Sequence, residues 1–113
     1  MKIAFTTSGR SLYDQVDIRF GRTKGILVFD DQTGATDYID NTANASLTQG
    51  AGTAAATLIA EKGIQVLVTG KVGPKAAQVL KDGNVKVYGG IGYGSIREVY
   101  DQYKKGLLTE QPL

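Results

Sequence analysis

The sequence predicts an α/β domain built on a five-stranded mixed sheet with three helices. Its second half alternates helical and strand patterns, in which alanine-rich stretches are followed by short apolar runs. This alternation is typical of parallel strands joined by helices. The first half instead places an Asp-Gln-Thr-Gly turn between two strand-like runs, which favours an antiparallel hairpin. The two halves together predict a sheet that is partly antiparallel and partly parallel.

The first three strands are expected at residues 2–6, 25–30 and 35–40. The first has Ile3 and Phe5 on one face. The second is apolar from 26 to 29, which favours a central position with both faces covered. The third alternates more and carries charge, as edge strands do. Residues 11–22 show no clean periodicity, and we expect them to form an ordered excursion between strands one and two.

Three helices are expected in the second half. Residues 51–62 carry one apolar stripe at helical spacing, and Gly63 ends this helix. Pro74 suits the first position of the next helix, which should run to about Asp82. Ser95 and Glu98 have the spacing of a capping box that opens the last helix. The buried stripe of that helix is expected to comprise Ile96, Val99, Tyr100, Tyr103 and Leu107.

Strands at 66–68 and 85–88 separate these helices. The small polar residues 41–49 are expected to form a loop, and the tail up to Leu113 is expected to be loose. Right-handed crossovers then give the strand order 3-2-1-4-5, with the first strand in the middle.

The turns after strands one, four and five open on the same edge of this sheet. We therefore expect Arg10, Lys71, Lys75 and the glycine-rich run 89–94 to converge there. Open α/β sheets bind anions at such an edge, where the carboxyl ends of strands meet the amino ends of helices. The sequence thus predicts an anion site at this rim.

Composition restricts the chemistry. The 113 residues correspond to one domain, 1–113, and the formal net charge is only +2, so we expect neither a nucleic-acid arm nor a membrane anchor. The chain has no Cys and no His, which removes disulfides, thiolate and imidazole metal ligands, and the commonest general base. It opens on a strand-like segment rather than a targeting signal, so a cytoplasmic location is expected.

Three segments carry a resemblance to a known family. They are SL at 11–12 with VDIRFGR at 16–22, QGAG at 49–52, and TG at 69–70 with VGPKA at 72–76. The likeness covers nearly the whole chain, which resembles the dinitrogenase iron–molybdenum cofactor-binding (NifX-like) family and, within it, the orange proteins. The resemblance implies a ribonuclease-H-like α/β fold that binds or carries a metal–sulfur cluster.

The chain departs from the family pattern at two places. Ile18 stands where members often have Pro, and the loop before the first helix has no His, which many members carry there. For orange proteins the resemblance implies a molybdenum–copper sulfide cluster held without covalent protein ligands. For NifX-like members it implies iron–molybdenum cofactor or its precursors, so an iron–molybdenum or iron–sulfur cluster is the alternative. The expected partners are cluster donor or acceptor proteins. The protein itself is expected to be a monomer or a dimer.

A sulfide-rich cluster is a bulky anion that cations, backbone N–H groups and apolar contacts can hold without ligation. Arg10, Arg22, Lys71 and Lys75 are the candidate cations. Glycines let the backbone approach closely, and the candidates are Gly50, Gly52, Gly73, Gly90 and Gly92. Apolar walls are expected from Phe20, Val72, Ile91 and Tyr93.

Other interpretations stay open. Arg19 and Arg22 could simply pair with Asp14 and Asp17 to hold a loop, because structural ion pairs are commoner than sites.

Catalysis is not expected: the first strand lacks the carboxylates of a ribonuclease-H-like nuclease, and no nucleophile–base constellation is visible. The glycine runs match neither dinucleotide nor P-loop motifs. A protein-interaction scaffold without cofactor is a further alternative.

Overall fold

A computed structural model of the protein describes residues 1–90 and 94–113. In this part of the chain the strands form one six-stranded sheet with the order β3-β2-β1-β4-β5-β6. The strands are β1 (Lys2–Thr7), β2 (Gly25–Asp30), β3 (Thr36–Asp40), β4 (Val66–Val68), β5 (Lys86–Gly89) and β6 (Thr109–Gln111). β1 pairs antiparallel with β2 and parallel with β4, and β5 continues the parallel part. The predicted mixed sheet and its order are confirmed, with β6 added beyond β5.

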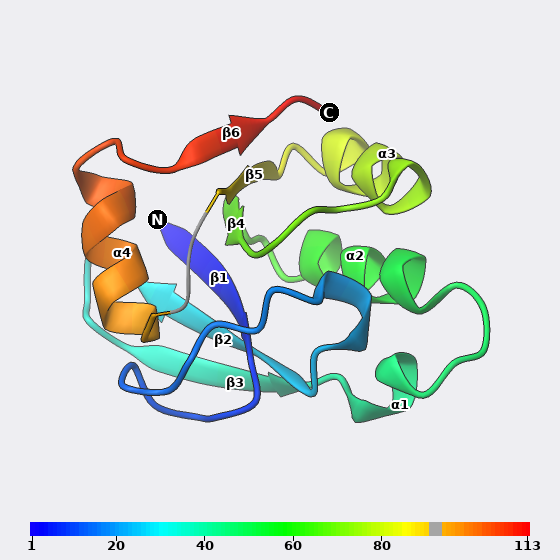
Figure 1. Ribbon diagram of the computed structural model, residues 1–113, viewed down its shortest axis with the longest axis horizontal. Coiled ribbons are helices and arrows are strands. Elements are labelled where there is room, and N and C mark those ends of the chain that lie inside the picture. Colours follow the sequence, from blue (N-terminus) through cyan, green and yellow to red (C-terminus); the bar gives the residue numbers. More distant parts are fainter. Residues whose placement is uncertain (91–93) are drawn as a thin grey trace.

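Helices cover both faces of the sheet (Figure 1). The helices are α1 (Thr42–Ala45), α2 (Ala51–Glu61), α3 (Pro74–Asp82), α4 (Ile96–Lys104) and the 3-10 helix η1 (Phe20–Arg22). On β1, Ala4 packs in the cluster that holds α2 and α3, whereas Ile3 and Phe5 pack in the cluster that holds α4. Successive strand residues point to opposite faces, so this alternation places α2 and α3 on one side and α4 on the other. None of the described helices has the length and apolar character that a membrane span requires.

The tail after α4 differs from the prediction. Gly106 adopts a positive φ of 72°, and its N–H donates to the Tyr103 carbonyl while that of Leu107 donates to Gln102. This is the hydrogen-bond pattern of a Schellman motif, in which glycine has no Cβ to clash. The motif ends the helix at Lys104, so Leu107 is 68% exposed instead of lying on the buried stripe. The chain then pairs as β6 with β5, and Leu113 packs against the α2–α3 core.

The polar segment 41–49 contains the one-turn helix α1 where only a loop was expected. Both the backbone N–H and the hydroxyl of Thr42 donate to the Asp40 carboxylate, at 2.9 and 2.7 Å. These bonds lower the pKa of Asp40, the backbone bond contributing most. The buried Asn41 side chain donates to the Thr23 carbonyl at 3.0 Å, which ties the start of α1 to the end of the excursion.

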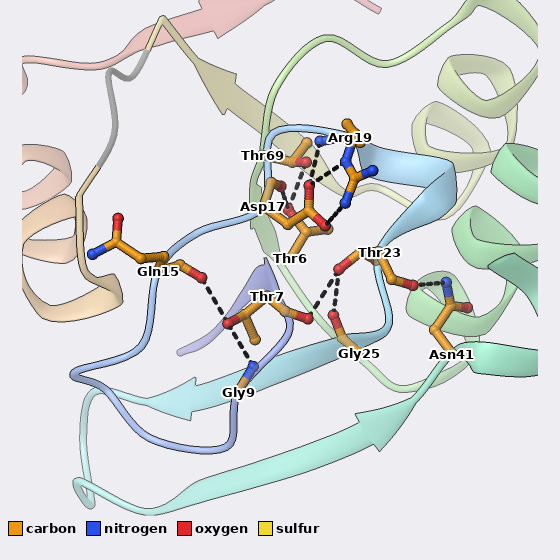
Figure 2. A network of polar contacts seen from close by, with 10 residues as sticks. All are labelled: Thr6, Thr7, Gly9, Gln15, Asp17, Arg19, Thr23, Gly25, Asn41 and Thr69. Carbon is orange, nitrogen blue, oxygen red and sulfur yellow. Dashed lines mark hydrogen bonds and ion pairs between the residues drawn. The ribbon is translucent and has the colours of Figure 1, made fainter.

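A buried polar network holds the excursion between β1 and β2, which is ordered as predicted (Figure 2). The hydroxyls of Thr6 and Thr69 lie 2.7 Å apart, linking β1 to the end of β4. Thr6 also donates to the Asp17 carbonyl, so Thr69 supplies the hydrogen between the two hydroxyls. Thr7 donates to the Gln15 carbonyl at 2.8 Å. The excursion is therefore anchored at the carboxyl end of β1, which the Thr6–Thr69 bond links to the end of β4.

Candidate functional site

A hollow of about 420 Å³ lies where the amino ends of α2 and α3 meet. That volume is within the range of small-molecule sites, roughly 300–1,000 Å³. Its walls come from η1, from the first turns of the two helices and from the segment between β4 and α3. The lining residues are Phe20, Gly21, Gly50, Gly52, Thr53, Lys71, Gly73, Pro74, Lys75 and Ala76.

Both helices open on this hollow without a side-chain cap. The N-cap residues are Gly50 for α2 and Gly73 for α3, and neither first turn contains an acidic residue. The first intrahelical bonds run from Ala54 to Gly50 and from Ala77 to Gly73, each 2.9 Å. The N–H groups before them have no intrahelical acceptor, and the helix dipoles add partial positive charge at the same place. The backbone alone therefore makes the hollow attractive to an anion.

Two lysines add full positive charge. Lys71 and Lys75 are exposed and line the hollow, and no Asp or Glu is among the described residues that line it. Positive side chains at a helix amino end oppose the helix dipole. A bound anion would relieve this repulsion, so the arrangement suits an anionic ligand better than an empty surface.

Phe20 supplies part of the apolar wall, together with Pro74 and Ala76. It is only 4% exposed and belongs to the core cluster that holds α2 and α3. The adjoining Gly21 lies so close to α2 that a Cβ there would be 2.8 Å from the backbone nitrogen of Gly52. η1 thus packs directly on the first turn of α2, which brings an aromatic ring to the edge of the anion-attracting hollow.

A second hollow, of about 470 Å³, shares the lining residue Lys71 with the first. Its lining residues are Ile18, Gly70, Lys71, Gly89, Gly90, Thr109, Glu110, Gln111 and Pro112. Gly70 meets the excursion here, because a Cβ on it would overlap the Ile18 carbonyl oxygen. Lys71 therefore lines both hollows, and the residue before it, Gly70, is tightly packed against the excursion.

The structure places Arg10 away from the lysines. Its guanidinium carbon lies 4.1 Å from the centroid of the Tyr38 ring on β3. Tyr38 packs in the cluster on the α4 face, opposite to α2 and α3. This corrects the expectation that Arg10 converges with Lys71 and Lys75: a cation–π contact places it beside the edge strand β3.

Arg22 and Arg19 both make structural contacts. Arg22 Nη1 donates to the carbonyls of Ala45 and Leu47, at 2.9 and 2.7 Å, so η1 is tied to the loop that leads into α2. Arg19 pairs with Asp17 at 3.1 Å, which raises the pKa of Arg19 through the side-chain hydrogen bond and the charge of that carboxylate. The predicted ion pair is confirmed for Arg19, whereas Arg22 uses backbone carbonyls instead of an aspartate.

The remaining predicted residues fall into three groups. Phe20, Gly50, Gly52, Lys71, Gly73 and Lys75 line the first hollow, and Gly90 lines the second. The Val72 side chain is 2% exposed and packs in the core, which corrects its expected place in the wall. Ile91, Gly92 and Tyr93 lie outside the described residues.

Sequence reasoning did not single out Gly21, Thr53, Pro74 or Ala76 as lining residues. Thr53, Pro74 and Ala76 could have been found from position, because they belong to the first turns of the two helices that follow Gly50 and Gly73. Among the described residues no group of three carboxylates could hold a metal ion, and the chain has no Cys or His. The groups that the described residues offer to this hollow are lysine ammonium groups, backbone N–H donors and apolar side chains.

The sequence and fold match known proteins over most of the chain. The profile of the dinitrogenase iron-molybdenum cofactor family matches residues 1–106. The apo form of the orange protein from Desulfovibrio gigas is 39% identical, with a TM-score of 0.92 over 97% of this chain and 92% of that one. A Thermotoga protein of the DUF35 family is 28% identical, with a TM-score of 0.83 over 96% and 91% of the two chains.

An uncharacterised protein of Methanocaldococcus jannaschii is 32% identical over 91 residues, which cover 78% of this chain and 73% of that protein. The family profile and these relatives agree with the resemblance found in the sequence motifs. The chain belongs to the dinitrogenase iron-molybdenum cofactor family.

Proposed function

We propose that this protein binds and carries an anionic metal–sulfur cluster of the molybdenum–copper sulfide type in the hollow between α2 and α3, without catalysing a reaction. The observation that carries the proposal is the convergence of two uncapped helix amino ends with Lys71 and Lys75. Membership of a cofactor-binding family and the similarity to an orange protein support a cluster as the cargo.

The physical basis is non-covalent. A sulfide-coated cluster spreads its negative charge over soft, weakly hydrated sulfur atoms, which accept hydrogen bonds from backbone N–H groups. Lys71 and Lys75 neutralise the charge, and the apolar lining residues Phe20, Pro74 and Ala76 suit the less polar sulfur surface. No coordinate bond from Cys or His is needed, which fits a chain that contains neither.

A second candidate cargo is iron–molybdenum cofactor or an iron–sulfur cluster, delivered during nitrogenase-type cofactor assembly. The family description favours this candidate. Both cargoes are bulky anions, so both would be held in the hollow by positive charge and backbone N–H groups. Elemental analysis of protein purified from its own source distinguishes them, because copper accompanies molybdenum only in the first.

The test is a titration of apo protein with tetrathiomolybdate and copper(I), followed by absorbance and by retention of metal after gel filtration. Wild-type protein should retain both metals in a fixed ratio. The variant Lys71→Ala/Lys75→Ala should bind about tenfold more weakly or worse, because two charge-assisted contacts are worth roughly 1.5 kcal/mol or more. Equal retention by wild type and this variant would reject the site.

A matched control removes two lysines elsewhere. Lys104 and Lys105 lie at the end of α4, on the other face of the sheet. The variant Lys104→Ala/Lys105→Ala has the same net charge as the site variant. It should bind like wild type, and equal weakening of both variants would mean that only overall charge matters.

A further inference from the structure

The side chain of Gln111 on β6 is bound to the segment that carries Lys71. The Val72 N–H donates to Gln111 Oε1 at 3.0 Å, and Gln111 Nε2 donates to the Val72 carbonyl at 2.8 Å. One amide group therefore satisfies both backbone groups of Val72, as a neighbouring strand would. Gln111 lies beyond residues 1–106, which the family profile matches.

The Val72 backbone stands directly between two lining residues of the proposed cluster site. Lys71 precedes it, and Gly73, the N-cap of α3, follows it. The Val72 side chain is buried in the core at 2% exposure, so this residue is fixed through its side chain and both backbone groups. Gly70, on the other side of Lys71, is packed against the Ile18 carbonyl. Lys71 is exposed but its backbone is held on both sides.

β6 is itself well placed to act as an anchor. Gln111 pairs with Val87 of β5, and Leu113 packs against the core cluster that contains Val72. The Gln111 amide also borders the second hollow, but its oxygen and one of its N–H groups already face Val72. These two bonds explain its orientation without a ligand, so Gln111 is not a contact residue for the cargo.

We infer that Gln111 is a positioning residue for the proposed cluster site. It holds residues 70–73 so that Lys71 and the amino end of α3 face the hollow between α2 and α3. The inference rests on the proposed function. It also specifies the residue type, because only a side chain that both donates and accepts at this length can bind both groups of Val72.

The first experiment measures uptake of tetrathiomolybdate and copper(I) by apo Gln111→Leu. Losing the two hydrogen bonds should weaken uptake roughly five- to thirtyfold. It should also speed hydrogen exchange at the Val72 amide, while circular dichroism shows a folded protein. The matched control is Gln102→Leu on the exposed side of α4, which should leave uptake and Val72 exchange unchanged.

Coupling to Lys71 separates positioning from general destabilisation. If Gln111 acts through the Lys71 segment, Gln111→Leu should weaken cluster uptake by a smaller factor in a Lys71→Ala background than in the wild-type background. The two losses of binding free energy are then not additive. Full additivity of the two losses would overturn the inference.

A pH profile gives a second, local test on the apo protein. In Gln111→Glu the ionised carboxylate can accept from Val72 N–H but repels the Val72 carbonyl, whereas the protonated acid restores a donor. The protonated form predominates only below the pKa of this carboxyl. The Val72 amide resonance should therefore move to its wild-type position as pH falls through that pKa. A resonance that stays displaced, or that never leaves the wild-type position, would overturn the inference.

The outcomes distinguish the two proposals. If wild-type protein takes up no cluster, the proposed function fails and the positioning role fails with it. If wild type takes up the cluster and Gln111→Leu does so equally, only the positioning role fails. Weakened uptake in Gln111→Leu, normal uptake in Gln102→Leu and non-additivity with Lys71→Ala together support both.

Discussion

Gly21 in η1 and Gly52 in α2 touch through their backbones, since a Cβ on Gly21 would lie 2.8 Å from the Gly52 nitrogen. No real Cβ fits at that distance, so either η1 or the first turn of α2 would have to move. This contact fixes η1, which carries Phe20, against the first turn of α2, and both elements line the proposed site.

Gly21→Ala should therefore destabilise the protein by about 1–3 kcal/mol, the usual cost of overpacking. Urea denaturation measures the effect. The control is Gly52→Ala, because a Cβ there meets only the Ala76 Cβ at 3.7 Å, an ordinary contact. Alanine is also the better helix former, so Gly52→Ala should be neutral or stabilising. Equal stability of wild type and Gly21→Ala would contradict the close contact.

Arg22 should control the loop before α2 through its bonds to the Ala45 and Leu47 carbonyls. Arg22→Ala should speed hydrogen exchange of residues 46–50 with little change in the urea midpoint. Arg22→Lys keeps the charge but lacks the planar guanidinium, so it should speed exchange nearly as much. Unchanged exchange in Arg22→Ala would show that the two bonds do not hold the loop.

Asp40 should contribute a pH-dependent part of the stability. Its bonds to Thr42 lower the pKa of Asp40 below its model-peptide value of 3.8. A lowered folded-state pKa means that the contribution is fully present above pH 3.8 and is lost as pH falls through the lower folded-state pKa. Asp40→Ala should thus have a lower urea midpoint than wild type at pH 7, and the gap should narrow below pH 3.8. A gap of constant size across this range would rule out the carboxylate as its source.

Much of the fold follows from local patterns. The apolar run in β2 and the short apolar β4 predict buried strands, and Asp31 to Gly34 predict the hairpin that the Gly34 N–H to Asp30 bond closes at 2.8 Å. Pro74 marks the start of α3 correctly. The two helix amino ends at the proposed site could be found because Gly50 and Gly73 each precede a periodic apolar segment.

The features that could not be predicted depend on partners distant in sequence. β6 has the sequence Thr-Glu-Gln, with no strand-like alternation, and it forms because β5 offers an edge and Val72 binds Gln111. Arg10 lies over the ring of Tyr38, a residue distant in sequence, instead of lying beside the lysines. Leu107 fits the helical period of α4, but the positive φ of Gly106 ends the helix first.

Amide chemical shifts during cluster uptake test the central claim most directly. Apo protein labelled with nitrogen-15 is titrated with tetrathiomolybdate and copper(I), and each backbone amide is followed. The amides of residues 51–53 and of Lys75 and Ala76 should shift most, because they are the donors at the two helix amino ends. Largest shifts in α4 or around Tyr38, with these five amides unmoved, would contradict the account.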